Sequence, residues 1–285
     1  MERKAMLQKI IKICLIILLI IILFPLWFMI SGSLMGKEEL LTRVSAMLFS
    51  IDESYVNWSL LPKQPGLWSY LELLLDTPEF FVTFWNSVKI TVYSVIGQVV
   101  VATTAAWGLT MYSFRGQKWI LSIYTILMML PFQVLVLPEY YVLQKLHLYD
   151  THLAIILVLI FSPLSVFLLV QNFKSLPIQQ VEAARLEGAG EWAIFWKIGL
   201  PHAKPGIISV MILCFIESYS TVEHPQAFLE TKQLMSLAQY LPQIDLSDAG
   251  IALAASVVAL IPCILIALLG EEYFEDGIMM KEQDL

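Results

Sequence analysis

Charged residues are scarce in this 285-residue chain, where Lys, Arg, Asp and Glu together make up only 14% of the sequence. Hydrophobic residues make up 58%, and the mean hydropathy is +0.75. A soluble domain of this length cannot bury so much apolar surface, so lipid must cover the remainder. The formal net charge of −7 also argues against nucleic acid as a partner, because binding nucleic acid requires a basic face.

Cysteine is almost absent, and the usual sequence patterns of enzymes are missing. Cys14, Cys214 and Cys263 all fall in apolar runs, with neither metal-ligand spacing nor an even number for disulfides. The four histidines do not form a metal-ligand pattern either. The sequence contains no G-x-x-x-x-G-K-[ST] string and therefore no phosphate-binding loop. We expect no metal site, no bound cofactor and no catalytic residue.

Long apolar segments, in contrast, occur throughout the chain, and six of them are long enough to cross a membrane. These are Ile10–Ile30 and, approximately, Val82–Tyr112, Trp119–Val142, His152–Phe173, Gly206–Val222 and Gly250–Gly270. The fifth is the shortest and carries Glu217, so five spans is the alternative count.

The first apolar segment has two interpretations. Arg3, Lys4 and Lys9 precede it, as in a secretory signal. The apolar run is longer than that of a typical signal, and no small-x-small cleavage site follows before Met35. We therefore expect an uncleaved first span, over about residues 10–32.

The distribution of Lys and Arg predicts the orientation. With the N-terminus inside, eleven of the seventeen basic residues are cytoplasmic, which places both termini in the cytoplasm. The longest external segment, residues 35–81, contains Trp58 and Trp68 and is expected to form a loop or short helices at the membrane interface. No Gly/Ser-rich linker or repeat divides the chain, so we expect one all-α membrane domain over residues 1–285.

The polar segment from Ser175 to Pro201 interrupts the apolar pattern. Pro177 suits the first turn of a helix, and apolar or small residues then recur near helical period. Gly188 and Gly190 suit the end of that helix. A second amphipathic stretch follows, and Pro201 is expected to stop it. The pattern predicts two short helices that meet near the glycine pair, on the cytoplasmic side.

A simpler interpretation of this segment stays open. An amphipathic hairpin could lie among the lipid headgroups, with Glu182 paired to Arg185 three residues later.

The spacing within this segment favours a different interpretation. It reads Glu182-Ala183-Ala184, three residues, Gly188, nine residues, Ile198-x-Leu200-Pro201. This string resembles the EAA loop of bacterial ABC-importer permeases. The resemblance implies a coupling helix that docks on a separate ATPase subunit, with Glu182 and Gly188 in contact with the ATPase cleft.

Other strings, over about residues 10 to 280, resemble carbohydrate-importer permeases of the MalG type, with the family core at about residues 70–275. The strings are Pro25-Leu26-Trp27, Trp85-Asn86-Ser87, Phe114-Arg115-Gly116, Met128-Met129-Leu130-Pro131 and Ile194–Pro201. Two positions depart from the pattern. Tyr219-Ser220-Thr221-Val222 stands where such permeases carry Trp-Asn-Asp/Glu-Phe, and the tail after Phe274 is acidic.

The resemblance implies a type I permease bundle of six transmembrane helices in a bacterial plasma membrane. The expected function is import of a sugar or oligosaccharide by alternating access. The expected partners are a second permease of the MalF type, a dimer of ATP-binding-cassette ATPases that uses ATP and Mg, and an extracytoplasmic solute-binding protein. A glycerol-phosphate, polyol or other polar cargo is the alternative, and a non-transporting membrane scaffold is a remote one.

Four residues are candidates for the solute path. Glu217 lies inside a span, where a carboxylate usually faces a cavity or a partner. The resemblance places this span beside the path, which adds Tyr219 and Ser220. Gln133, next to Pro131, is the fourth. Alternatively, Glu217 is solvated at the outer end or packs against the partner permease, and Gln133 bonds only between helices.

Overall fold

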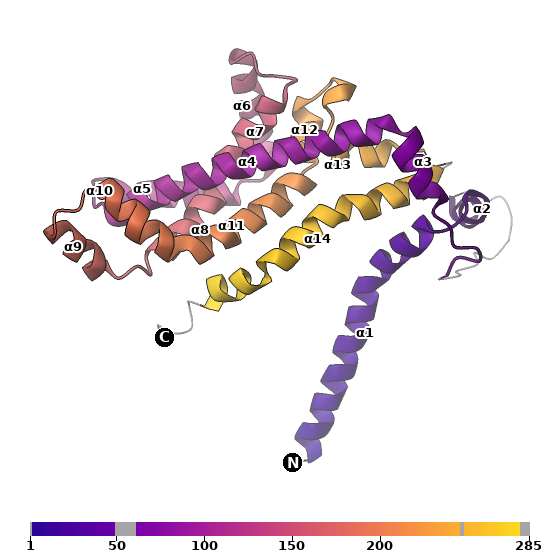
Figure 1. Cartoon of the computed structure of the whole chain (residues 1–285), viewed down its shortest axis with the longest axis horizontal. Helices are drawn as coiled ribbons and strands as arrows, with labels where there is room; N and C mark the ends of the chain where they lie inside the picture. The colour runs from indigo at the N-terminus through magenta and orange to yellow at the C-terminus, as the bar shows by residue number, and fades with distance from the viewer. Residues whose placement is uncertain (1, 49–60, 246–247, 280–285) are drawn as a thin grey trace. The chain divides into compact units, whose positions relative to one another are not determined.

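The computed structural model describes residues 2–48, 61–245 and 248–279, and every regular element within these ranges is a helix (Figure 1). The all-α prediction is therefore confirmed. The chain forms two compact units, Met1–Phe81 with Tyr240–Ile261, and Val82–Gln239 with Pro262–Leu285. Two long helices, α4 (Pro78–Met111) and α14 (Ala249–Met279), contribute to both. Trp58 and the tail from Met280 onward lie outside the described residues.

Five helical segments in the described part of the chain are long and apolar enough to cross a membrane. They are Gln8–Ser33, Pro78–Met111, His152–Phe173, Glu191–Ser220 and Ala249–Gly270. A bent pair, α5 (Gln117–Met129) and α6 (Phe132–Lys145), makes a sixth if it is counted as one span. The count of five or six agrees with the prediction.

The third span is not the single straight helix that the apolar run over Trp119–Val142 predicts. α5 and α6 meet at an angle of 107°. Leu130 has ψ 128° and Pro131 has ψ 149°, so both lie outside the helical region. A proline disfavours the helical conformation of the residue before it, which explains why the chain leaves the helix at Leu130. A similar interruption separates α7 (His152–Ile160) from α8, which begins at Pro163 and ends at Phe173.

The predicted stop at Pro201 is wrong, and the fifth span is longer than Gly206–Val222. α10 (Glu191–Ile194) continues through a π-helical turn, η1 (Phe195–Gly199), into α11 (Leu200–Ser220). Pro201 lies in the first turn of α11, directly after this wider turn. The altered hydrogen-bond register of a π turn lets the chain pass a residue that has no N–H to donate.

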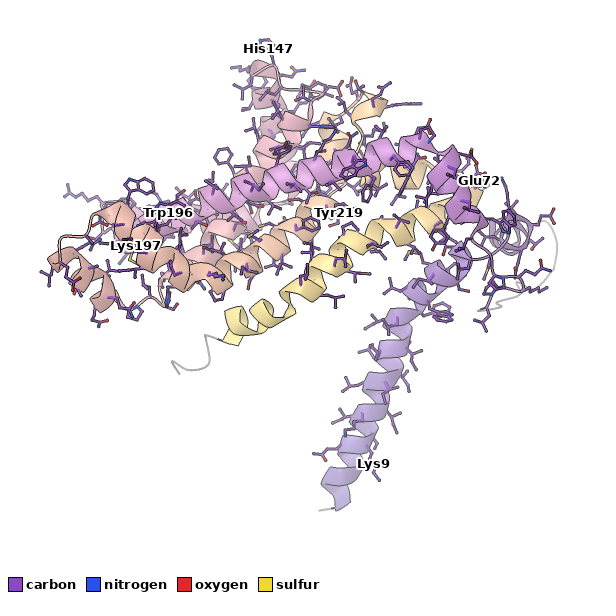
Figure 2. The ribbon with its side chains drawn as sticks, in the orientation of Figure 1. Lys9, Glu72, His147, Trp196, Lys197 and Tyr219 are labelled. Atoms are coloured by element: carbon purple, nitrogen blue, oxygen red, sulfur yellow. The ribbon has the colours of Figure 1, made fainter. Side chains whose placement is uncertain are left out.

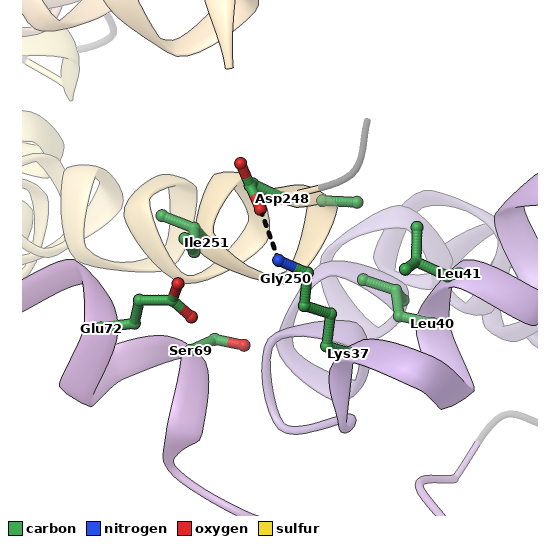
Figure 3. A pocket seen from close by; sticks show the side chains of 9 residues that line it. Lys37, Leu40, Leu41, Ser69, Glu72, Asp248, Gly250 and Ile251 are labelled. Carbon is green, nitrogen blue, oxygen red and sulfur yellow. Dashed lines mark hydrogen bonds and ion pairs between the residues drawn. The ribbon is translucent and has the colours of Figure 1, made fainter. Parts of the chain in front are cut away.

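The first unit contains α1 (Glu2–Ser33), α2 (Lys37–Leu48) and α3 (Trp68–Asp76). α2 and α3 agree with the expectation of short helices in the described part of residues 35–81. Figure 3 shows Lys37 reaching Asp248, with Nζ 2.9 Å from Oδ1, beside a cavity of about 20 Å³. The cavity has room for about one water, so it holds no solute. The ion pair is exposed and contributes little stability.

The apolar side chains of α1 between Ile10 and Leu23 are uncovered in the described structure. None of the 18-residue apolar window of α1 is buried, and the large side chains from Ile10 to Leu23 are exposed. Lipid or another protein chain must cover them.

The second unit is built around α4, α8 and α11. Its core contains Leu169, Val170 and Phe173 of α8, all buried, packed with Ala106 of α4 and Ala203 of α11. α8 and α11 approach closely because Gly206 lacks a side chain. A Cβ at that position would collide with the amide of Asn172.

The segment after α11, residues 223–239, folds back onto α4. It contains α12 (Glu223–Phe228), η2 (Lys232–Leu234) and the start of α13 (Leu237–Tyr240), and η3 (Leu241–Gln243) follows it in the chain. Asn86 donates from Nδ2 to the carbonyls of Gln233 (2.7 Å) and Met235 (3.1 Å). Ser87 Oγ accepts from the N–H of Leu237 at 2.8 Å. The Asn-Ser pair of α4 thus fixes this segment.

Asp150, in the turn between α6 and α7, makes a second clamp on the same segment. It accepts hydrogen bonds from the backbone N–H groups of Glu230 (2.8 Å) and Thr231 (3.0 Å) and from the Thr231 hydroxyl. These bonds, the hydroxyl first, lower the pKa of Asp150. Its φ of +56° is a conformation that Asp and Asn tolerate better than other non-glycine residues.

Replacing Asp150 should loosen this clamp. In Asp150→Ala we expect the Glu230 and Thr231 amides to exchange hydrogen roughly tenfold faster, since about 1.4 kcal/mol of hydrogen bonding is lost. Asp150→Asn, which tolerates the positive φ and keeps an acceptor, should show a smaller effect. Because folding lowers this pKa, the stabilisation is complete above the unfolded value of about 3.9 and is lost as pH falls through the folded value.

Hydrogen exchange followed by mass spectrometry measures this effect. The matched control is Asp76→Ala, which removes an exposed carboxylate from the end of α3. Equal protection in wild type and Asp150→Ala would show that Asp150 is not the clamp.

Candidate functional site

The two ends of the polar segment between α8 and α11 are held close together by the side chain of Ser175. Ser175 Oγ donates to the carbonyl oxygen of Asn172 at 2.6 Å and lies 3.2 Å from Nε2 of His202. Ser175 stands at the start of the segment and His202 directly follows its end. Loop 175–201 therefore leaves and re-enters the helix bundle at neighbouring points.

The first helix of this loop is α9 (Ile178–Leu186), which begins after Pro177 and ends at a glycine motif. The N–H of Gly188 bonds to the carbonyl of Arg185, and the N–H of Ala189 bonds to that of Ala184, both at 3.0 Å. This is the Schellman pattern, which requires a left-handed residue after the helix. Gly188 has φ +83°, so the predicted glycine stop is confirmed.

α9 buries one face and displays the other. Val181 is fully buried and Ala184 is half-buried against the core of the second unit. On the other face Glu182 and Ala183 are exposed, and 90% of Leu186 is exposed. In Figure 1, α9 lies at the left edge of the view, beyond α10. Glu182, Ala183 and Leu186 are therefore accessible to another protein.

A bidentate ion pair fixes the angle between the two arms of the loop, which are α9 and the continuous segment of α10 and η1. Arg185 donates from Nε to Glu191 Oε1 at 2.8 Å and from Nη2 to Oε2 at 3.1 Å. The hydroxyl of Tyr112, just after α4, also donates to Glu191 Oε2 at 2.8 Å. This bond raises the pKa of Tyr112, so the phenol stays protonated and keeps donating. Arg185 forms its ion pair with Glu191 rather than with Glu182, although the charge of Glu182 also acts on Arg185.

The second arm is anchored by the indole of Trp107 on α4. Its ring centroid lies 5.4 Å from that of Phe173 on α8 and 5.4 Å from that of Phe195 on η1. Gly199 leaves room for the ring, because a Cβ there would lie 2.5 Å from Trp107 Cζ3. The half-buried Ile198 and Leu200 pack against the same core, while Pro201 is exposed.

Two tryptophans remain uncovered on this arm. Trp192 is 71% exposed and Trp196 is 63% exposed. Figure 2 shows Trp196 and Lys197 near the loop and Tyr219 toward the opposite end of α11. Large exposed aromatic rings beside an exposed lysine suit a membrane interface or a protein contact.

The four candidates for the solute path do not meet in one cavity. Glu217 is exposed on α11. Tyr219 is only 7% exposed and stacks on Phe215, with ring centroids 5.8 Å apart. The Ser220 hydroxyl donates to the carbonyl of Ile216 at 2.6 Å. Gln133 lies apart from these three, in a groove between α6 and α12.

Sequence reasoning did not identify Trp107, Tyr112, Glu191 or His202 as parts of the loop structure. Tyr112 and Glu191 are 79 residues apart, and Ser175 and His202 are 27 apart. No local spacing rule connects such pairs. The sequence offered one signal, since Glu191 follows Gly190 in the first turn of a helix, where a carboxylate is favoured.

Comparisons with known proteins agree on one kind of protein. Residues 98–279 match the family described as "binding-protein-dependent transport system inner membrane component". The arabinooligosaccharides transport system permease protein AraQ of Bacillus subtilis (strain 168) is 30% identical over 260 residues, 90% of this chain and 88% of AraQ. The sn-glycerol-3-phosphate transport system permease protein UgpE of Brucella abortus (strain 2308) is 25% identical over 280 residues, 94% and 95% of the two chains.

The fold also matches a solved structure. A chain from the crystal structure of a bacterial ABC transporter involved in the import of the acidic polysaccharide alginate superposes with a TM-score of 0.80 at 20% identity. The match covers 96% of this chain and 98% of that chain.

The contact between Trp107 and Gly199 can be tested by adding one methyl group. Gly199→Ala forces the indole or the π turn to move, and overpacking of this kind costs about 1–3 kcal/mol. We expect a lower midpoint of thermal unfolding in detergent, measured by tryptophan fluorescence. The matched control is Gly108→Ala on α4, where nothing lies within 4 Å of the added Cβ. If both variants unfold at the wild-type temperature, the contact does not hold the arm.

Proposed function

Because the chain belongs to the family of binding-protein-dependent transport system inner membrane components, we propose that it is the permease subunit whose loop 175–201 couples a separate ATPase to solute import. The observation that carries this proposal is the exposed face of α9. Glu182, Ala183 and Leu186 project from a helix whose opposite face is buried.

The chemistry of that face fits a protein groove. Small side chains such as Ala183 let a helix backbone approach another protein closely. Leu186 supplies an apolar contact that is unfavourable in water and favourable when it is covered. Glu182, with no basic neighbour bonded to it in the described structure, offers its charge to a basic partner.

The loop is also built to transmit movement rather than absorb it. The Arg185–Glu191 fork joins α9 to α10, and α10 is continuous with α11 through η1. Ser175 and His202 hold the base together. A displacement of α9 by a closing ATPase dimer therefore moves α11 and, through Trp107, α4. Rigid-body motion of packed helices around a solute path is one established type of switching transition.

The partners follow from this assignment. We propose that a second permease of the MalF type completes the pore, that an ATPase dimer binds ATP and Mg, and that an extracytoplasmic binding protein delivers the solute. This chain then binds no nucleotide. The eleven basic residues on one side support an orientation with both termini in the cytoplasm of a bacterial plasma membrane.

We propose an oligosaccharide as the cargo. AraQ, a permease of an arabinooligosaccharide system by its name, supports this choice. UgpE, named for sn-glycerol 3-phosphate, keeps that solute as the second candidate. Glu217, Tyr219 and Ser220 remain candidates for contact with the solute path.

Two substitutions test the coupling role. Glu182→Lys reverses a charge on the docking face, and Gly188→Asp places a side chain at φ +83° and on the same exposed surface. We expect each to lower ATP-driven uptake at least tenfold while the chain still inserts and pairs with the second permease. Copurification of the ATPase and uptake by proteoliposomes measure the two effects.

The controls change the same residue types elsewhere. Asp76→Lys reverses an exposed charge on α3, and Gly190→Ala changes a loop glycine whose φ is −70° and tolerates alanine. Both should keep wild-type uptake. The coupling assignment is wrong if Glu182→Lys and Gly188→Asp leave ATPase binding and uptake intact.

A further inference from the structure

A groove of about 330 Å³ lies between the start of α6 and α12, away from the coupling loop. Its lining residues are Phe132, Gln133, Val136, Glu223, Gln226 and Ala227. The groove is wide open to the surface, so it can contact one face of a solute without enclosing it.

Two interruptions of helical structure create this groove. The chain bends by 107° just before Phe132, and it leaves α11 at Thr221, which has ψ 130°. Phe132 and His224 hold the two breaks together, with ring centroids 4.8 Å apart. Beneath them Phe228 of α12 is fully buried. The groove is therefore a formed feature of the second unit.

One polar side chain of the groove, that of Gln133, is unusual for its position. Gln133, Glu223 and Gln226 are all exposed, and in the part of the chain that the structure describes none of their side chains makes a hydrogen bond. Gln133 stands at the start of α6, within an apolar segment that belongs to a candidate span. A carboxamide facing hydrocarbon would lose its hydrogen bonds to water at a high cost. Such a group is stable where it faces water or a polar ligand.

The lining groups suit a particular solute chemistry. The two carboxamides both donate and accept hydrogen bonds, Glu223 accepts them, and Phe132 offers an apolar ring face. A sugar presents the complementary pattern, because its hydroxyl groups surround a ring whose C–H face is apolar. No Lys or Arg is among the lining residues. A carboxylate without a cation beside it repels anions and leaves neutral solutes unaffected.

We propose that this groove is a solute-contact site on this permease subunit, that it binds neutral, hydroxyl-rich solutes, and that Glu223 excludes anionic ones such as phosphate esters. The proposal rests on the proposed transport function and deepens it, because it separates an oligosaccharide cargo from glycerol phosphate. The groove adds Glu223, Gln226 and Phe132 to Gln133 as solute contacts.

Water access and charge preference can be measured without knowing the solute. In the assembled transporter, Gln226→Cys is exposed to two methanethiosulfonate reagents, one carrying trimethylammonium and one carrying sulfonate. We expect labelling by both, at least fivefold faster with the cationic reagent. The further change Glu223→Gln should abolish most of that difference, while Asp76→Asn on α3 should not. The chain without the introduced cysteine gives the background from Cys14, Cys214 and Cys263.

Transport gives the second measurement. Proteoliposomes with the complete transporter and its binding protein are supplied with arabinotriose or with sn-glycerol 3-phosphate. We expect uptake of the neutral probe. Gln133→Ala and the nearly isosteric Glu223→Gln should each raise KM about fivefold, the effect of one lost hydrogen bond. ATPase activity stimulated by the unloaded binding protein should not change.

Several results would overturn the proposal. They are absence of labelling at Gln226→Cys, faster labelling by the sulfonate reagent, preferred uptake of sn-glycerol 3-phosphate, and loss of subunit assembly in the groove variants. The last would identify the groove as a contact with the second permease. Failure of the transport function itself is distinguished by the coupling variants Glu182→Lys and Gly188→Asp. If these abolish uptake and the groove variants do not, only the groove proposal fails.

Discussion

The packing of the Trp107 indole against Phe173, Phe195 and the backbone of Gly199 determines where the projecting loop lies. This one ring on α4 contacts α8 and η1, two segments that are far from it in the sequence. Without a side chain at Gly199 the ring can lie directly on the π turn, so the loop and the spans share one core. The polar contacts of Tyr112 and Ser175 then adjust the angle of a loop that is already anchored.

Much of the fold follows from local rules, and the exceptions have physical reasons. Apolar runs of about twenty residues predict spans, and a glycine at position 188 predicts the end of α9 because glycine tolerates the positive φ that a helix end requires. Pro131 and Pro201 have different effects on helical structure, and local sequence rules do not predict the difference. Pro131 ends a helix, whereas Pro201 is accommodated because a π turn precedes it. The turn depends on packing around Trp107, which lies 92 residues before Gly199 in the sequence.

The site shows the same division. The spacing from Glu182 to Pro201 led to the loop, and its exposed face agrees with the proposed docking role. The fork of Arg185 and Glu191 was not foreseen, because a pair across a glycine turn follows no helical period. The sequence predicts solute-path residues in the last turn of α11 and at Gln133, and these stay predictions. The proposed groove adds α12, where a helix of six residues follows the break at Thr221.

The π turn at Phe195–Gly199 fixes a rotational phase between the loop and the fifth span. A π turn amounts to one residue inserted into an α-helix, and each residue of an α-helix advances about 100° around the axis. With that extra residue, α10 presents Glu191 to both Arg185 and Tyr112. A helix one residue shorter would carry Glu191 about a quarter-turn away and separate the two arms. Length variation among such permeases should therefore concentrate in the connections between spans and spare this turn.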